Sequence, residues 1–311
     1  MEQRIAIIDL GTNTFHLLIT SLENKQSKIL HSEKQAVKIG VGGINQNIIS
    51  LEGMQRAIDC LLKYKQKLDE WNVNRVLALG TSALRNANNG QEVIQKIKKE
   101  TGIEVQLISG AQEAEYIYYG VKSALNLGKE KSLIVDIGGG SVEFIIGNEK
   151  EIFWKQSFEI GAQRLLEIYH KQDPILKSEI DQLTNYFEKS LKPLQDAVEK
   201  FKPDTLAGSS GTFDTLSEIY CIENNIPISR SDGETLLTIE GFFSIYKDII
   251  SKNRSQRMQI PGMIEMRVDM IVVGSCLVHY LIKKFTLTTI RVSTYSLKEG
   301  AMSIEILRTM Q

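Results

Sequence analysis

The chain has 311 residues, of which 42% are hydrophobic and 24% are charged, and its formal net charge at pH 7 is −1. This length predicts about two domains, each large enough to form its own core. The nearly neutral balance argues against a protein that holds nucleic acid or a membrane surface by its overall charge. The first expected strand begins by Arg4, which leaves no room for a signal peptide, and the most apolar run, 270–282, is too short to cross a bilayer. We therefore expect a soluble, cytoplasmic protein.

The three cysteines of the chain, Cys60, Cys221 and Cys276, are far apart and lack metal-ligand spacing. We expect them to be reduced residues of the core. The four histidines likewise share no metal spacing, and each is expected to be structural.

The first predicted element is a hairpin over residues 5–19. Its apolar first strand ends in the carboxylate of Asp9, and the turn that follows contains Gly11, Thr12, Asn13 and Thr14. A glycine in such a turn lets a phosphate approach the backbone amides closely, and the hydroxyl groups add further donors. The turn therefore predicts a phosphate-binding site, although an ordinary tight hairpin fits the same pattern.

The same arrangement recurs in the second half of the chain, over residues 133–146. Asp136 follows Asp9 by 127 residues and ends an apolar strand, and Glu143 lies on the same face of the outgoing strand. The turn before Glu143 contains Gly138, Gly139, Gly140 and Ser141. An acid beside bare amides suits a phosphate together with a hard cation such as Mg2+. Because the pattern occurs once in each half, it predicts two similar lobes that face one cleft.

A strand over 27–39 is predicted next, followed by a long helix that Ser50 caps and by a strand over 75–79. The apolar face of the long helix is expected to contain Leu51, Met54, Ile58, Leu61, Leu62 and Leu68. A short helix and a strand over 104–108 then complete the sheet of the first half.

Two charged residues of the first half are candidates for chemistry. Arg85 follows a strand and a run of small hydroxyl residues, a position that suits an anion site, although an arginine on a solvated loop fits as well. Ser109 and Gln112 have capping-box spacing, so a helix is expected to begin there with Glu113 in its first turn. Glu113 is then either a partner of the helix dipole or a residue of the cleft.

The second half continues with a strand over 151–160, a helix that opens at 161–164 and a charged helix over 176–201. A strand from 204 then leads into a turn and a helix through Ile219; the turn contains Gly208, Ser209, Ser210, Gly211 and Thr212. Backbone amides at a helix start make this turn another candidate anion site. Helices over 239–250 and 264–283, a strand over 288–292 and a helix over 296–310 complete the prediction.

Segments 9–16, 37–40, 80–85, 108–114, 136–143, 208–212 and 297–300, taken in order, resemble the exopolyphosphatase/guanosine pentaphosphate phosphohydrolase (Ppx/GppA) family. Each motif is weak alone, but the ordered set covers nearly the whole chain. The resemblance implies an α/β fold of two actin-like (ribonuclease H-like) lobes, as in the sugar kinase, Hsp70 and actin superfamily, with the active site in the interlobe cleft. It places the lobes at 1–125 and 126–296, with helix 297–311 packed back on the first lobe.

The resemblance also implies a hydrolase that releases terminal orthophosphate from inorganic polyphosphate, with Mg2+ or another divalent cation as cofactor. Glu113 would orient and deprotonate the attacking water, and Arg85 would brace the transferred phosphoryl group. Asp136, with Asp9 and Glu143, would hold the cation, and the three turns would bind phosphates. Guanosine pentaphosphate or tetraphosphate is the alternative substrate, and a homodimer is one assembly that the family suggests.

Several positions depart from the family pattern. Thr12 and Thr14 stand where serines are usual, and Gln112 replaces a frequent glutamate. Ser296 and Lys298 replace a typical glycine and arginine.

Gln112 makes a nucleotide-binding sensor without activity an alternative, although the presence of Asp136, Glu143, Glu113 and Arg85 together argues against it. An ATP-dependent kinase of the same superfamily is a further alternative, but the acid for an acceptor hydroxyl and the adenosine pocket that it would need are not recognisable.

The helical C-terminal domains of the long family members are not expected in this chain. Short polyphosphates could be held by the turns, by Arg85 and by flanking cations such as Lys38 and Arg164. A long chain would need more positive charge along its path, so the sequence predicts a preference for short polyphosphates.

Overall fold

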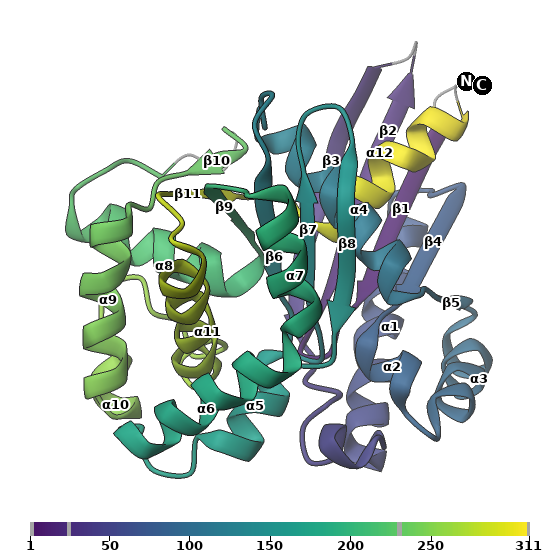
Figure 1. Ribbon diagram of the computed structural model, residues 1–311. Coiled ribbons are helices and arrows are strands. Elements are labelled where there is room, and N and C mark those ends of the chain that lie inside the picture. The colour runs from purple at the N-terminus through teal and green to yellow at the C-terminus, as the bar shows by residue number, and fades with distance from the viewer. Residues whose placement is uncertain (1–2, 24–25, 229–231, 310–311) are drawn as a thin grey trace. The chain divides into compact units, whose positions relative to one another are not determined.

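The computed structural model describes residues 3–23, 26–228 and 232–309 (Figure 1). The chain forms two compact units. Unit 1 contains Met1–Gly120 and Leu297–Gln311, and unit 2 contains Val121–Ser296. The chain first passes from unit 1 to unit 2 after Gly120, five residues before the predicted end of the first lobe at residue 125. None of the helices in the described part of the chain has the length and hydrophobicity to cross a lipid bilayer.

Unit 1 is built on a five-stranded sheet with the order β3-β2-β1-β4-β5. Its strands are β1 (Gln3–Leu10), β2 (Thr14–Glu23), β3 (Gln26–Ala36), β4 (Arg75–Gly80) and β5 (Val105–Leu107). Its helices are the 3-10 helix η1 (Ile44–Gln46), α1 (Leu51–Glu70), α2 (Ser82–Asn86), α3 (Gly90–Thr101), α4 (Gly110–Ala124, which continues into unit 2) and α12 (Leu297–Thr309). Alternate residues of β1, among them Ile8 and Leu10, pack in the core that α1 and α3 cover. Asp9 therefore lies on the opposite face of the sheet, against which α12 packs.

Unit 2 is built on a six-stranded sheet with the order β10-β11-β9-β6-β7-β8. Its strands are β6 (Ser132–Ile137), β7 (Val142–Gly147), β8 (Ile152–Phe158), β9 (Thr205–Ser209), β10 (Glu234–Thr235) and β11 (Thr289–Ser293). Its helices are α5 (Ala162–Tyr169), α6 (Lys177–Ser190), α7 (Lys192–Phe201), α8 (Ser210–Glu223), α9 (Ile239–Ser251), α10 (Arg254–Arg257) and α11 (Met270–Phe285).

The two sheets share one topology. The order β8-β7-β6-β9-β11 in unit 2 repeats β3-β2-β1-β4-β5 in unit 1, with the same sequence of antiparallel and parallel pairings. The predicted repeat of an acid-ended hairpin in each half is thus part of a repeat of the whole sheet. The prediction of an α/β fold with two actin-like lobes is confirmed.

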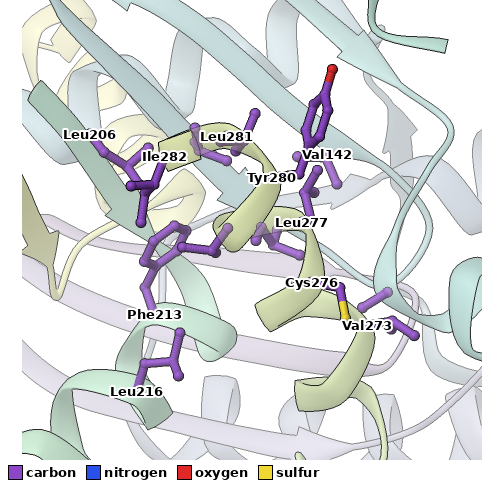
Figure 2. Close-up of a cluster of buried hydrophobic side chains, with 14 of the residues drawn as sticks. Val142, Leu206, Phe213, Leu216, Val273, Cys276, Leu277, Tyr280, Leu281 and Ile282 are labelled. Carbon is purple, nitrogen blue, oxygen red and sulfur yellow. The ribbon is translucent and has the colours of Figure 1, made fainter. Parts of the chain in front are cut away.

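The core of unit 2 lies between its sheet and helices α8 and α11. Figure 2 shows side chains of α11, including Leu277 and Leu281, in one cluster with Val142 and Leu206 of the strands and Phe213 of α8. The three cysteines are buried and form no disulfide, as predicted. Burial raises the pKa of the Cys60 thiol to about 11 and that of Cys276 to about 12, so both remain protonated at neutral pH.

Helix α1 begins as predicted, because the Ser50 hydroxyl accepts a hydrogen bond of 3.0 Å from the Gly53 amide. Its predicted apolar face is wrong at two positions. Leu51 is 74% exposed and Leu62 is 41% exposed. The buried stripe instead follows Met54, Ala57, Ile58, Leu61, Tyr64 and Leu68, and residue 62 lies about 100° around the helix from residue 61.

Two predicted helices have different limits. The helix over 176–201 is two helices, α6 and α7, which meet at Leu191; Pro193 lies in the first turn of α7, where a missing N–H is tolerated. The helix expected to begin at Ile264 begins at Met270, because the preceding segment forms separate turns. In the described part of the chain the last helix ends at Thr309. Met310, where we expected its end, lies outside the described residues.

Candidate active site

The turn between β6 and β7 in unit 2 holds its carbonyl groups away from any ligand. The carbonyls of Gly138, Gly139 and Gly140 accept hydrogen bonds from the first amides of α5 and the residue before it, those of residues 162, 163 and 161, at 2.9, 2.9 and 3.2 Å. Arg164 adds a bond of 2.9 Å from Nε to the Gly140 carbonyl. Within the described part of the chain, the amides of Gly139, Gly140 and Ser141 have no acceptor. The turn therefore presents donors and no acceptors, as an anion site requires.

This contact explains why Gly161 precedes α5. A Cβ atom at this position would lie 2.4 Å from the backbone of Gly139 and Gly140, so only glycine allows α5 to reach the turn. Arg164 was expected to be a flanking cation for polyphosphate. It is 9% exposed and donates to a carbonyl of the turn itself, so its place is next to the predicted phosphate turn.

The turn between β1 and β2 in unit 1 is held in the same manner by a different segment. The Asn13 carbonyl accepts from the amides of Val37 and Lys38 at 3.0 and 2.9 Å, and the Thr12 carbonyl accepts from Gly40 at 3.2 Å. The amides of Gly11 and Thr12 have no acceptor among the described residues. Here too the donors remain for a ligand.

The same bonds explain why β3 ends at Ala36 and not at the predicted Ile39. Val37 and Lys38 leave the sheet to bind the turn, and Lys38 takes a left-handed conformation with φ 51°. The side chains of Thr12, Asn13 and Thr14 are all buried, with exposures of 4%, 4% and 7%. The predicted phosphate turn of unit 1 is thus a preorganised element.

Arg85 and Glu113 lie together in unit 1. Arg85, on α2, donates from Nη1 to Glu113 Oε2 at 2.6 Å and to the Ile108 carbonyl at 3.1 Å. Both side chains are largely buried, with exposures of 17% and 8%. The sequence placed each residue in the site separately, but it did not predict that they form an ion pair.

The predicted capping box at the start of α4 is confirmed. The Gln112 amide donates to Ser109 Oγ at 3.2 Å, and the Ser109 amide donates to Gln112 Oε1 at 3.0 Å. Gln112, which replaces a frequent glutamate, therefore supports the helix that carries Glu113. Its side chain has a structural role beside the candidate base.

Asp136 is a buried carboxylate surrounded by hydroxyl groups. Its side chain is 5% exposed, and its Oδ2 accepts hydrogen bonds from Ser209 at 2.7 Å, Ser210 at 2.6 Å and Ser296 at 2.5 Å. No residue in the described ranges forms an ion pair with it or donates to its Oδ1. A buried charge is costly unless it is paired or coordinated, so this carboxylate is suited to receive a cation.

Glu143 is the cross-strand partner of Asp136 in the β6–β7 pair, which places both side chains on one face of the sheet. It is 1% exposed, and its Oε1 accepts a bond of 2.7 Å from Ser157 of β8. Asp9 occupies the position in unit 1 that is equivalent to that of Asp136, and its cross-strand partner is His16. Sequence reasoning missed Ser157 and Ser296, because neither belongs to a turn motif.

In the turn before α8, the predicted phosphate ligands are side chains with contacts elsewhere and backbone amides without an acceptor. The hydroxyls of Ser209 and Ser210 are directed to Asp136, while Gly208 lies under the ring of Phe213 and Thr212 contacts Gly274 of α11. The first amides of α8, those of residues 210–212, have no acceptor in the part of the chain that the structure describes. These amides fit the predicted anion site better than the side chains do.

A cation that the sequence did not indicate lies beside the same turn. The guanidinium of Arg267 packs on Gly211, where a Cβ atom would lie 2.0 Å from Cζ. It makes no hydrogen bond or ion pair with any described residue. Burial lowers the pKa of Arg267, while the carboxylates of Asp214 and Asp136 act in the opposite direction. The segment between α10 and α11 carries no motif, so no signal pointed to this residue.

The donor set fits Mg2+ but not an all-protein metal cage. No group of three or more His, Cys, Asp or Glu side chains that could hold a metal ion occurs among residues 3–23, 26–228 and 232–309. Unit 2 offers the two neighbouring carboxylates Asp136 and Glu143. Mg2+ is usually bound by one or two carboxylates together with waters and substrate phosphates.

Comparison with known proteins agrees with these features. Residues 18–309 match the Ppx/GppA phosphatase family. The chain is 28% identical over 306 residues to a guanosine-5'-triphosphate,3'-diphosphate pyrophosphatase from Photobacterium profundum; the match covers 98% of this chain and 60% of that protein, so the chain spans less than two thirds of its length.

Two solved structures extend the comparison. An exopolyphosphatase from Cytophaga hutchinsonii is 46% identical and superposes with a TM-score of 0.95, covering 98% of each chain. A Ppx/GppA family member from Aquifex aeolicus is 26% identical, with a TM-score of 0.81 over the full length of both chains. The match to the family extends over nearly the whole chain; it begins within β2, after Asp9 and the turn at 11–14, and includes Arg85, Glu113 and the Asp136 hairpin. The chain therefore belongs to the Ppx/GppA phosphatase family.

Proposed function

We propose that this chain is a phosphoanhydride hydrolase that releases terminal orthophosphate from inorganic polyphosphate with the help of Mg2+. One observation carries the proposal most directly: Asp136 is buried, has no ion-pair partner among the described residues, and stands at the end of a strand whose turn offers only amide donors. A buried carboxylate beside a turn that offers backbone amide donors suits a magnesium–phosphate substrate.

In this proposal, each unit has phosphate-binding groups and a carboxylate of its own. The turns at 11–14 and 138–141 and the start of α8 bind phosphate oxygens through backbone amides, and Arg267 adds positive charge beside α8. Asp136 would hold the cation, with Glu143 and Asp9 as further carboxylates. A divalent cation bound there would neutralise charge that develops on the transferred phosphoryl group.

Glu113 is the proposed acceptor of the proton from the attacking water. Its ion pair with Arg85 fixes the orientation of the carboxylate. An ionised carboxylate paired with arginine is not a strong base, but phosphoryl transfer passes through a loose transition state in which positioning matters more than base strength. Arg85, which also binds the Ile108 carbonyl, would brace the phosphoryl group from the position that this pair defines.

Polyphosphate is the first choice of substrate because the relative with 46% identity is an exopolyphosphatase. Guanosine pentaphosphate is the second, because the Photobacterium relative is named for that activity. The test measures orthophosphate release from both substrates side by side, with Mg2+ and with a chelator, for the parent and for Asp136→Asn. We expect release from polyphosphate that the chelator and the substitution abolish. Release from guanosine pentaphosphate alone would favour the second substrate, and release from neither would contradict the proposal.

A further inference from the structure

Three hydroxyl groups converge on a single oxygen atom of Asp136. Ser209, Ser210 and Ser296 all bind Oδ2, and Oδ1 accepts no hydrogen bond from the residues that the structure describes. These three serines come from three places in the chain: the end of β9, the start of α8 and the residue before α12. Because all three hydroxyls bind Oδ2, they fix the plane of the carboxylate and leave Oδ1 available.

The backbone is strained in order to build this arrangement. Ser210 has φ 69°, a left-handed conformation that a residue with a side chain rarely adopts. A strained conformation persists only where its surroundings determine it, and it is often associated with a functional site. The Ser210 hydroxyl lies 2.6 Å from Asp136 Oδ2 and 3.3 Å from the hydroxyl of Ser296. The strain therefore brings a donor to the carboxylate.

Ser296 supplies a donor that no local motif could provide. It is the last residue of unit 2, and it reaches Asp136 from 160 positions along the chain. An oxygen atom with two lone pairs does not need three donors merely to be satisfied. The third hydroxyl adds rigidity to the carboxylate, and rigidity of a metal ligand contributes to metal affinity.

We propose that Ser296 is a positioning residue, which together with Ser209 and Ser210 holds the carboxylate of Asp136 so that Oδ1 is presented to a divalent cation. This inference rests on the proposed function, because it requires a cation at Asp136. It goes further by proposing that the hydrogen bond from the Ser296 hydroxyl to Asp136 increases the affinity of the protein for that cation. In this proposal Ser296 acts through its hydrogen bond to Asp136.

The test measures binding of Mn2+ alone to the full chain, in the absence of any substrate, from the electron paramagnetic resonance signal of the free ion. The proteins are the parent, Ser296→Ala, Ser296→Thr, Asp136→Asn and Ser217→Ala. Ser217 is the matched control, since it is also buried in unit 2 but donates to the Leu236 carbonyl at 2.8 Å. We expect Ser296→Ala to weaken Mn2+ binding by about 10- to 100-fold, Ser296→Thr to restore most of the affinity, and the control to bind as the parent does.

A purely structural role would give a different pattern, in which Ser296→Ala lowers the melting temperature while the folded protein binds Mn2+ with unchanged affinity. That result overturns the inference but leaves the cation at Asp136 in place, provided that Asp136→Asn loses binding. A parent that binds no Mn2+ overturns the inference, whereas the proposed function is tested separately by the release of orthophosphate with Mg2+ and with a chelator. If Ser296→Ala does not fold, Ser210→Gly takes its place, because glycine accepts φ 69° and the change removes the hydroxymethyl group that donates to Asp136. Parent-like Mn2+ affinity in Ser210→Gly would also overturn the inference.

Discussion

At the scale of single residues, the ion pair between Arg85 and Glu113 changes how the candidate base is understood. Acids in the first turn of a helix usually serve the helix dipole, and such a residue remains exposed. Glu113 is buried, and its carboxylate is held at 2.6 Å by Arg85. Its position is therefore defined by a specific partner and not by the helix alone.

This geometry predicts the behaviour of Glu113→Gln. The amide can still accept a bond from Arg85, so substrate binding and KM are expected to change little. The loss of the proton acceptor is expected to lower kcat by roughly 10²- to 10⁴-fold, the usual contribution of general base catalysis. Steady-state phosphate release measures both parameters. The control is Glu92→Gln, because Glu92 is an exposed acid in the first turn of α3. If kcat of Glu113→Gln equals that of the parent, Glu113 is not the base and interacts only with the helix dipole.

At the scale of elements, α5 connects the predicted phosphate turn of unit 2 with a buried polar cluster. The start of the helix binds the carbonyls of residues 138–140, and its end leads to His170. The His170 side chain is 5% exposed, and its Nε2 lies 3.5 Å from Asp173 Oδ1. Arg257, which is 1% exposed, donates to the same carboxylate oxygen at 2.7 Å.

This cluster predicts a loss of stability in mild acid. Burial lowers the pKa of His170 below its usual value of 6.5, and the charge of Arg257 acts in the same direction, against smaller opposing effects of Asp173 and Glu179. Below pH 6.5 the unfolded chain therefore binds a proton that the folded protein does not, and the free energy of unfolding falls as the pH falls.

The measurement is the melting temperature between pH 7 and pH 5. The decrease is expected to be smaller in His170→Gln than in the parent. The lowered pKa values of Asp173 and Glu179 contribute only at more acid pH, so they do not obscure this range. His31→Gln controls for the loss of a histidine in unit 1. An equal slope in His170→Gln and the parent would show that another group causes the acid sensitivity.

At the scale of the whole molecule, the distribution of charge bears on the length of substrate. The chain has 37 basic and 38 acidic residues, so it offers no net positive charge to a polyanion. Arg164 is bound to the Gly140 carbonyl and is not available to a distant phosphate. Each further phosphate of a long substrate brings a charge that must be neutralised elsewhere.

We therefore expect distributive digestion of long polyphosphate, in which the enzyme dissociates between cuts. A partial digest on a gel should show a ladder that shortens smoothly with time. Addition of excess unlabelled polyphosphate during the digest should stop the shortening of labelled chains. If full-length chains coexist with orthophosphate alone, and the unlabelled chains have no effect, digestion is processive and the expectation is wrong.

The sequence by itself determined the elements whose causes are local. Glycine turns between apolar strands predicted both hairpins, and the capping residues Ser50, Ser109 and Gln112 predicted where two helices begin. Local patterns were less accurate where packing decided the outcome. Leu51 and Leu62 are apolar but exposed, and the segment before Met270 forms turns that bring Arg267 to Gly211.

Only the tertiary structure decided which side chains meet. Arg85 and Glu113 are 28 residues apart, and Ser209 and Ser296 reach Asp136 across 73 and 160 residues. The carbonyls of both turns are bound by segments that no turn motif includes, 37–40 and 161–164. A sequence pattern records the conformational preferences of neighbouring residues, whereas these contacts depend on the direction in which folded strands and helices bring distant residues together. The sequence thus predicted two glycine turns as phosphate sites, and the tertiary structure decided which carbonyl groups of those turns are occupied by other segments of the chain.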